Sequence, residues 1–550
     1  MMVHLSACAS VSPEPHTHTH THTQAQTQTR AGSGVEGARR YLRDAGLDET
    51  EALIRLLVRF PTVRDTALGA AAPNEPAFRE MAAFLKSWSE DAGLTFNAVD
   101  GNEVWEISFG EGTPELAFVM HADVVPPGDA SGWTTSPYEA TRVGERIYGR
   151  GTEDDKGAIA ALLVVMRTLK RFGVTPGRRV VAVLGTGEES DWSGMKRYAS
   201  QMSDSTDVIS VDAGFPVVFG ENGFVAWKLR MPTVLEGPDD AHCLRAVNVS
   251  GGEFLTQVPG EAWLDIESNM AADRAFDVHA AVESAVSAER GARGEMFGVE
   301  VERRDGVVRI VARGKAVHSS IPEEGHNALW PLSRVAGRLP LCRGGIERMM
   351  TLVRDFFDGD DFGVRLGVAY ADPMMGRLVV APTVLRFVDD HVELAINMRR
   401  PAGRTDEAFH SMLDAALAKV RSSVDPALEE MSERYVGTPH VADHESHLVH
   451  TLLDVYRELS GDRAARPISI RGGTYARLFK GAVNFGPSVP ELPYRGHAPD
   501  EYIERSSLSL ISRGLFEAIV RLSGPKTRID ELDDTAGGSS QPSFGRSLRR

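Results

Sequence analysis

Leu116-Ala-Phe-Val-Met-His121-Ala-Asp123 is a short apolar run that ends in a histidine and a carboxylate. Two later stretches have the same form: Val180–Glu189 ends in two glutamates, and Val208–Asp212 ends in an aspartate. Short runs of this kind are typical of buried strands in a mostly parallel sheet. Ligands of open α/β sheets bind just outside the carboxyl ends of the strands, so we expect these side chains to meet. Imidazole and carboxylate ligands suit a zinc-like ion, and the sequence therefore predicts a metal-dependent enzyme.

The segment Gly149-Arg-Gly-Thr-Glu-Asp154-Asp155-Lys156-Gly157 strengthens this prediction. Acidic residues at the start of a helix usually serve as caps. Here the two aspartates precede Gly157–Phe172, which is apolar nearly all round and is predicted to be a central, buried helix. Buried carboxylates require a partner, and a metal ion is the natural one.

Composition narrows the function classes. The chain has 550 residues, of which 42% are hydrophobic and 25% charged, as in ordinary globular proteins. A formal net charge of −17 argues against nucleic acid or an anionic membrane as a partner. The longest purely apolar stretch, Ala158–Met166, is too short to span a bilayer. The three cysteines, Cys8, Cys243 and Cys342, are too few for a disulfide framework and are expected to be free or buried thiols.

The chain ends differ in composition from the rest. The first residues are rich in His, Thr and Gln, and are interpreted as a low-complexity tail, with metal capture by its histidines as the alternative. Leu5-Ser-Ala-Cys8 resembles a lipoprotein cleavage box, but the charged start and apolar core of a signal peptide are missing. We therefore expect a cytoplasmic protein; a lipid-anchored envelope protein is the alternative if the true start lies upstream of Cys8.

Helix and strand patterns alternate on both sides of a segment with a different, mixed character. We predict an α/β catalytic domain with a mostly parallel central sheet, interrupted by an inserted α+β lid or dimerisation domain. The expected divisions are a disordered tail at 1–35, a first catalytic segment at 36–228, the inserted lid at 229–434, a second catalytic segment at 435–528 and another disordered tail at 529–550.

Several further residues are candidates for the site, although each has an ordinary structural explanation when taken alone. His318 falls in the predicted insert, where a lone histidine is more often structural. Arg399, after a strand that ends at Asn397, is either a surface charge or a clamp for a carboxylate. The turn that contains Gly473 and Thr474 is of the kind that lets a ligand approach the backbone.

Taken in order, these motifs resemble the co-catalytic zinc peptidases and amidohydrolases, which include aminoacylase, succinyl-diaminopimelate desuccinylase and carboxypeptidase G. The likeness is strongest to the bacterial dipeptidase branch of Xaa-His dipeptidase and carnosinase-like enzymes. It covers about residues 36–528 and rests on these motifs: HADVVPPG, IYGRGTEDDKG, TGEES, VDAGFP, KAVHSSIPEEGHNA, GGTYAR and GHAPDE. The family fold, a catalytic α/β domain interrupted by a lid, agrees with the pattern above.

The resemblance implies two zinc ions, with Mn²⁺ or Co²⁺ as substitutes. One ion would be held by His121 and Asp212, the other by Glu189 and His497, and Asp154 would bridge both. The peptide bond between Asp154 and Asp155 would be cis, as is typical of the family.

The resemblance also assigns roles around the metals. Glu188 would be the general base, Asp123 the partner of His121, and His318 the lid residue that polarises the scissile carbonyl. Arg399 would take the substrate carboxylate. We also expect Asn397, Gly473 and Thr474 to contribute to substrate binding.

One departure concerns the lid motif usually written N-M-V-P, which stands here as Thr256-Gln-Val-Pro259, so that Thr256 replaces an asparagine expected near the substrate. This change bears on specificity rather than on hydrolysis.

The implied activity is hydrolysis of short peptides, dipeptides above all, by a water that two zinc ions activate. An N-acyl-amino-acid amidohydrolase is the alternative enzyme. A non-catalytic metal-buffering protein is a third hypothesis, against which the complete ligand set and Glu188 argue. A monomer and a homodimer are both compatible with the sequence.

Overall fold

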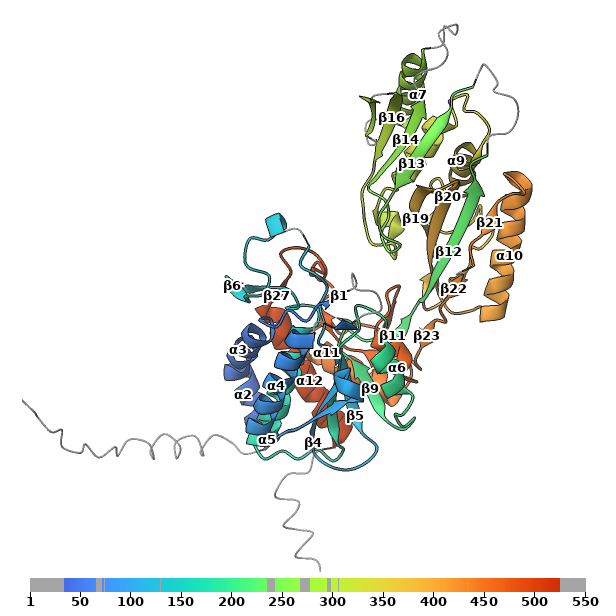
Figure 1. The fold of residues 1–550 in the computed structure, drawn as a ribbon. Coiled ribbons are helices and arrows are strands. Elements are labelled where there is room, and N and C mark those ends of the chain that lie inside the picture. Colours follow the sequence, from blue (N-terminus) through green and yellow to red (C-terminus); the bar gives the residue numbers. More distant parts are fainter. Residues whose placement is uncertain are drawn as a thin grey trace, which may run out of the picture.

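The computed structural model describes residues 34–65, 72–73, 75–128, 130–234, 243–267, 277–293, 298–304, 306–432 and 434–524. The tails predicted at 1–35 and 529–550 lie almost wholly outside these residues. The chain forms two lobes, each built on its own sheet (Figure 1).

The lobe that contains the segments predicted to be catalytic is called the catalytic lobe, and its sheet the catalytic sheet. This sheet has parallel strands at its centre and antiparallel strands at its edges. Its spatial order is β23 (His440–Val441), β11 (Val218–Glu221), β25 (Val483–Asn484), β9 (Asp207–Ser210), β5 (Leu116–His121), β8 (Val180–Gly185), β4 (Val104–Phe109) and β3 (Thr95–Val99), with β24 (Ile468–Ile470) also paired to β11. The strands β25, β9, β5 and β8 run parallel. The predicted α/β fold class is confirmed, although the sheet as a whole is mixed.

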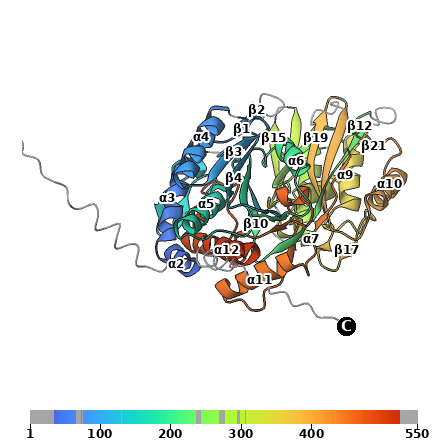
Figure 2. The ribbon, with the colours of Figure 1, turned by 90° about the horizontal axis from the view of Figure 1, so that it is seen from below.

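Both faces of this sheet are buried, which explains why its strands are apolar without alternation. On β5, Leu116, Phe118 and Met120 enter one hydrophobic cluster, whereas Ala117 and Val119 enter another on the opposite face. The larger cluster is covered by α2 (Val35–Tyr41), α3 (Leu47–Leu57), α4 (Glu75–Asp91), α5 (Lys156–Arg171), α11 (His447–Ser460) and α12 (Arg505–Ser523), and the smaller by α6 (Ser193–Ala199) and η6 (Tyr475–Leu478) (Figure 2).

Helix α5 is the predicted central helix. It packs between the sheet on one side and α3 and α12 on the other, so residues Gly157–Met166 are all buried. Asp155 is its N-cap residue, and the Asp154–Asp155 peptide bond is cis, as expected.

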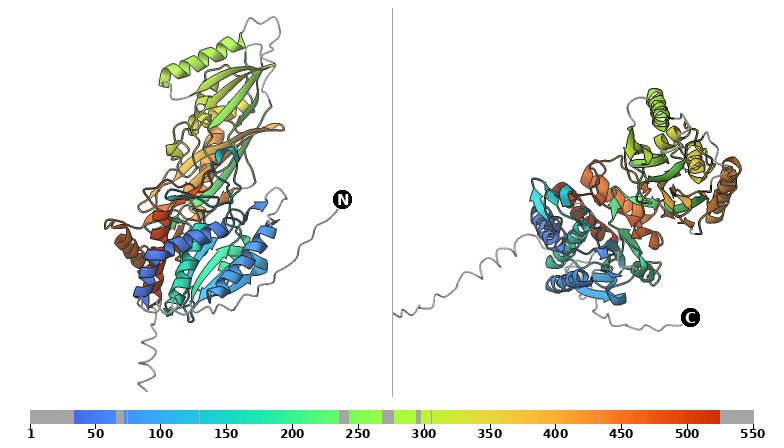
Figure 3. Two further views of the ribbon diagram at one scale, coloured as in Figure 1. Left: turned by 90° about the vertical axis from the view of Figure 1, so that its left-hand side faces the viewer. Right: turned by 45° about the horizontal axis from the view of Figure 1, so that its top comes forward.

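The second lobe contains an antiparallel sheet with helices packed against it (Figure 3). Its strand order is β15 (Val299–Arg304), β16 (Val307–Arg313), β14 (Glu261–Glu267), β13 (Ala246–Gly251), β19 (Val379–Val388), β20 (His391–Arg400), β12 (Gly223–Pro232) and β21 (Glu429–Glu430), with β22 (Tyr435–Val436) also paired to β12. The helices of this lobe are α7 (Val278–Arg293), α8 (Leu329–Ala336), α9 (Gly345–Phe356) and α10 (Asp406–Ser423).

The chain crosses between the lobes at two points. Strand β11 ends at Glu221 in the catalytic sheet and β12 begins at Gly223 in the second sheet, several residues before the division predicted at 228. The return lies between Val436 of β22 and His440 of β23, close to the division predicted at 434.

The expectation of free thiols is wrong for two of the three cysteines. Cys243 and Cys342 form a disulfide in the second lobe. The pair was hidden in the sequence because the two residues are 99 positions apart and are brought together by a short bridge between Leu244 and Leu341. Among the described residues, no helix has both the length and the apolar character needed to cross a membrane.

Candidate metal centre

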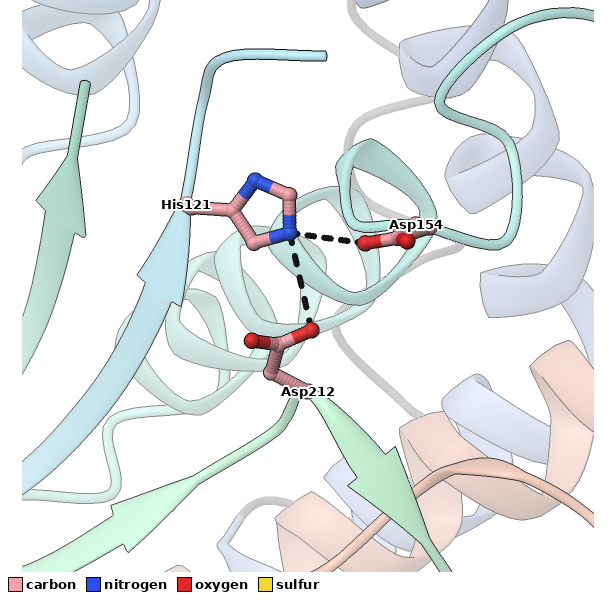
Figure 4. A group of neighbouring side chains, drawn as sticks. All are labelled: His121, Asp154 and Asp212. Atoms are coloured by element: carbon pink, nitrogen blue, oxygen red, sulfur yellow. Dashed lines mark hydrogen bonds and ion pairs between the residues drawn. The ribbon is translucent and has the colours of Figure 1, made fainter. Parts of the chain in front are cut away.

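The first group of metal-ligand atoms surrounds His121, the last residue of β5 (Figure 4). Its Nε2 lies 2.7 Å from Asp154 Oδ1 and 3.5 Å from Asp212 Oδ1. Its Nδ1 lies 2.9 Å from the main-chain oxygen of Asp123, which can only accept, so Nδ1 carries the hydrogen. Nε2 is thereby left to present its lone pair to a cation.

The second group shares Asp154 with the first. His497 Nε2 lies 2.7 Å from Glu189 Oε1 and 3.2 Å from Asp154 Oδ2. In the two triads His121–Asp154–Asp212 and Asp154–Glu189–His497 the candidate ligand atoms lie within 4.8 Å of one another, and the group His121–Glu188–Glu189 meets the same limit. The structure thus brings together all five residues that the resemblance names as ligands, with one carboxylate oxygen of Asp154 facing each histidine.

The electrostatics of the centre favour a cation. Burial raises the pKa of Glu188 well above its ordinary value, and the negative charges of Asp212 and Glu189 raise it further. Burial likewise raises the pKa of Asp212 to about 6, against the opposing effect of His121. Buried carboxylates that repel one another need positive charge, and two imidazoles with several carboxylates form a donor set that fits Zn²⁺, Mn²⁺ or Co²⁺.

Asp123 fastens the loop that carries the predicted base. Its carboxylate accepts hydrogen bonds from the main-chain N–H groups of Glu188 (3.1 Å) and Glu189 (3.0 Å). Its contact with the imidazole of His121 is made through its main-chain oxygen, and its carboxylate Oδ1 lies 3.6 Å from Nδ1. Asp123 therefore contacts His121 through its main-chain oxygen and the loop of Glu188 and Glu189 through its carboxylate.

His318 of the second lobe lies within electrostatic reach of His497 and Arg399 of the same chain. Its Nδ1 accepts a hydrogen bond from Ser320 N at 3.3 Å, so the hydrogen of the neutral ring lies on Nε2. Burial and the positive charges of Arg399 and His497 lower its pKa to about 4. The ring therefore remains neutral near pH 7 and offers an N–H donor within electrostatic reach of His497.

Arg399 is a buried guanidinium whose hydrogen bonds among the described residues all go to uncharged acceptors. It donates to Asn397 Oδ1 at 3.2 Å, to the main-chain oxygen of Arg471 at 3.3 Å and to Ser319 Oγ at 3.5 Å. Burial, followed by the charge of Arg477, lowers its pKa to about 10. Asn397 is fully buried, so its visible role is to orient Arg399.

The glycine-rich turn is fixed by a buried acid. Thr474 donates through Oγ1 to Glu221 Oε1 at 2.7 Å and through its N–H to Glu221 Oε2 at 3.0 Å. A Cβ at Gly473 would lie 2.8 Å from the guanidinium of Arg477, so a larger residue there would displace the end of that side chain. In the structure Thr474 supports the turn from inside.

Two tyrosines near the centre were not predicted. Tyr494 donates a hydrogen bond to Asp154 Oδ2 at 2.6 Å, and the hydroxyl of Tyr475 accepts one from Gly187 N at 3.3 Å. Both residues stood inside or beside quoted motifs, but nothing in the spacing indicated that their hydroxyl groups reach the metal loops.

Comparison with known proteins agrees with this geometry. Residues 117–520 match the model of Peptidase family M20/M25/M40. A Bacillus subtilis protein named "Putative dipeptidase YtjP" is 31% identical over 469 residues, which cover 84% of this chain and 95% of that protein. A Staphylococcus epidermidis protein named "Putative dipeptidase" is 27% identical over 468 residues, with coverage of 85% and 95%.

Solved structures show the same fold at low sequence identity. A tripeptidase from Staphylococcus aureus is similar with a TM-score of 0.51 and 15% identity, covering 87% of this chain and 99% of that one. The di-peptidase Dug1p from Saccharomyces cerevisiae is similar with a TM-score of 0.50 and 14% identity, covering 89% and 98%. With ligand triads that share one aspartate and a family match over most of its length, the chain belongs to Peptidase family M20/M25/M40.

Proposed function

We propose that this protein is a dipeptidase that uses two zinc ions. The observation that carries the proposal is the sharing of Asp154 between two ligand triads, with Glu188 buried beside them. The relatives named as dipeptidases support the same substrate class. When bound, the two ions would supply a water of lowered pKa and an electrophile for the scissile carbonyl.

The side chains around the ions would divide the remaining work. Glu188, whose raised pKa suits a group that takes and returns a proton, would act as the general base and then protonate the leaving amine. The Nε2–H of His318 would donate to the carbonyl oxygen as negative charge develops on it. Because His318 comes from the same chain as the ligands, a monomer and a homodimer both contain this set of groups.

Arg399 supports a substrate with a free carboxylate. Its guanidinium is buried, and its protein acceptors are uncharged, so an anion would find an unneutralised partner there. Such a clamp selects the C-terminus of a short peptide and leaves no place for a chain that continues past it.

The test compares one dipeptide with its C-terminal amide and its N-acetyl form, using the zinc-loaded protein. We expect rapid cleavage of the dipeptide and a lower kcat/KM for the amide, equivalent to a loss of ~2–5 kcal/mol in transition-state stabilisation, because the buried guanidinium would remain unpaired. Equal rates on the amide would refute the clamp. Faster cleavage of the N-acetyl form would identify an N-acyl-amino-acid amidohydrolase instead.

The disulfide favours a location outside the cytoplasm for the mature protein. Structural disulfides persist in oxidising compartments and are rare in the cytosol. Of the two locations considered from the sequence, the envelope is therefore the one that the Cys243–Cys342 pair supports. Alkylation of thiols in intact cells, before and after reduction, checks this: Cys243 and Cys342 should be labelled only after reduction.

A further inference from the structure

Two buried glutamates join the loop of the bridging ligand to the loop of the last ligand. Glu501, four residues after His497, accepts hydrogen bonds from the N–H groups of Gly151 (3.0 Å), Glu153 (2.9 Å) and Asp154 (3.1 Å). Its carboxylate is also paired with Arg150 at 2.6 Å. One carboxylate of the downstream loop thus organises the main chain of the upstream loop up to the bridging aspartate itself.

The second glutamate makes the same connection in the opposite direction. Glu153, next to Asp154, accepts hydrogen bonds from the N–H groups of Arg495 (2.6 Å) and Gly496 (3.1 Å), directly before His497. Its other oxygen accepts from Ser488 Oγ at 3.4 Å. Glu153 and Glu501 are both buried, at 9% and 0% exposure, where hydrogen bonds to N–H groups are stronger than in water.

The backbone on either side extends this connection. Strands β7 (Arg146–Tyr148) and β27 (Tyr502–Glu504) pair in an antiparallel ladder, with Tyr148 opposite Tyr502, and Gly149 N donates to Glu501 O at 2.9 Å. The loop of Asp154 follows β7, and the loop of His497 precedes β27. The hydrogen bonds of Glu153 and Glu501 therefore connect the two loops directly beyond the paired strands.

The conformation of His497 shows why such a connection is needed. This residue has a φ of 65°, in the left-handed region that a non-glycine residue adopts only at an energetic cost. Such a conformation persists only where the surroundings hold it. The bonds from Glu153 to residues 495 and 496, and from Arg150 Nη2 to His497 O at 3.4 Å, lie directly at this point.

We propose that Glu153 and Glu501 form a reciprocal clamp that sets the position of His497 relative to Asp154, and so determines affinity at the Asp154–Glu189–His497 site. Both are positioning residues. The inference rests on the proposed two-ion centre. Loss of Glu153 should have a selective effect, since His121, the last residue of β5, and Asp212, two residues past the end of β9, receive no hydrogen bond from Glu153 in the described part of the chain.

The test is a titration of metal-free protein with Zn²⁺ against a chromophoric chelator, which gives a constant for each ion, together with the melting temperature of the metal-free protein. Glu153→Gln is the main variant, because Glu501→Gln leaves Arg150 buried without its partner and endangers folding. His497→Ala identifies which of the two dissociation constants belongs to the Asp154–Glu189–His497 site. In Glu153→Gln we expect the affinity for Zn²⁺ at the Asp154–Glu189–His497 site to fall by ~10–100-fold, while the affinity at the other site is unchanged.

Glu289→Gln is the matched control. Glu289 is also buried, at 5% exposure, but pairs with Arg334 in the second lobe. It should lower the melting temperature and leave both constants as they are. The proposal is overturned if Glu153→Gln leaves both zinc affinities unchanged, as Glu289→Gln should. It is also overturned if Glu153→Gln lowers both affinities equally, or lowers only the affinity for the ion that His497→Ala still binds. Wild-type protein that binds a single ion would overturn the two-ion centre itself, and this inference with it.

Discussion

At the scale of single residues, neighbours in the sequence have different environments. Glu188 and Glu189 are consecutive, and Asp123 holds both main-chain N–H groups. Only Glu189 is directed to His497, at 2.7 Å, whereas Glu188 is surrounded by Asp212, Glu189 and Asp123 and has the more strongly raised pKa. The pair is therefore suited to a division into a ligand and a base.

The first prediction separates these two roles. Glu188→Ala should still bind two zinc ions and lose ~10²–10⁴-fold in kcat, because a proton-transfer group is removed without loss of a ligand. Glu189→Ala should bind less zinc. Metal analysis beside steady-state kinetics checks both variants. Loss of zinc from Glu188→Ala, with zinc retained by Glu189→Ala, would show that the roles are reversed.

The second prediction concerns His318. His318→Ala should bind zinc normally and lose ~10²–10³-fold in kcat, with a smaller change in KM, since a donor to the developing oxyanion is lost. Wild-type rates in this variant would remove His318 from the mechanism. Ser446→Ala, which removes the N-cap hydrogen bond of α11 in the catalytic lobe, is a control for general loss of stability.

The pH dependence of His318 follows from its lowered pKa. With a folded-state pKa of about 4 instead of the ordinary 6.5, the ring loses its proton well below neutral pH and stays neutral from about pH 5 upward. Above pH 5, kcat/KM should therefore depend on pH in the same way in the wild-type protein and in His318→Gln, whose activity is lower. A limb near pH 6.5 that disappears in this variant would contradict the assigned pKa.

At the scale of elements, the second lobe is tied internally by its disulfide. Cys243 precedes β13, and Cys342 lies between α8 and α9, so the bond closes a long loop that contains β13, β14, β15, β16, α7 and α8. Leu244 N donates to Pro340 O at 2.7 Å, and Cys342 N donates to Leu244 O at 2.8 Å, which aligns the two segments.

The third prediction is that this bond stabilises the protein without taking part in the reaction. Replacing both cysteines by serine should lower the free energy of unfolding by about 2–4 kcal/mol, because the unfolded chain regains the freedom of the closed loop. Denaturant unfolding measures the loss, and kcat at low temperature should be unchanged. Cys8→Ser serves as the control and should alter neither quantity. An unchanged unfolding curve for the double variant would contradict the bond.

At the scale of the whole molecule, the two lobes meet beside the metal centre. Arg471 of the catalytic lobe donates to Ser320 O at 3.0 Å and to Glu323 Oε1 at 2.6 Å, and its own main-chain oxygen accepts from Arg399. These contacts hold the segment of His318 against the lobe that carries the ligands.

The fourth prediction tests this contact. The Arg471–Glu323 pair is partly exposed, at 26% and 34%, and such pairs contribute about 0–1 kcal/mol. Glu323→Gln should therefore lower kcat/KM by no more than about fivefold, and the difference from wild type should shrink at high salt. Glu429→Gln, which removes the exposed pair with Arg230, seven residues along β12 from the crossing between the lobes, should have no effect. A large, salt-independent loss in Glu323→Gln would assign Glu323 to substrate binding instead.

The elements and most of the site could be predicted from the sequence because their causes are local. Apolar runs such as Leu116–Met120 specify strands, the carboxyl end of each strand specifies where its polar neighbour lies, and ordered motifs specify the family. The five candidate ligands were named in this way, and the structure places their side chains together.

The remaining features depend on contacts that only the folded chain creates. The Cys243–Cys342 bond, the hold of Glu221 on Thr474 and the clamp of Glu153 and Glu501 each join residues far apart in sequence. Glu501 stands in the GHAPDE motif, yet its role could not be inferred, because it acts on main-chain N–H groups, which every residue but proline carries. Side-chain chemistry is visible in a sequence, whereas the direction of a hydrogen bond to the backbone is decided by tertiary structure alone.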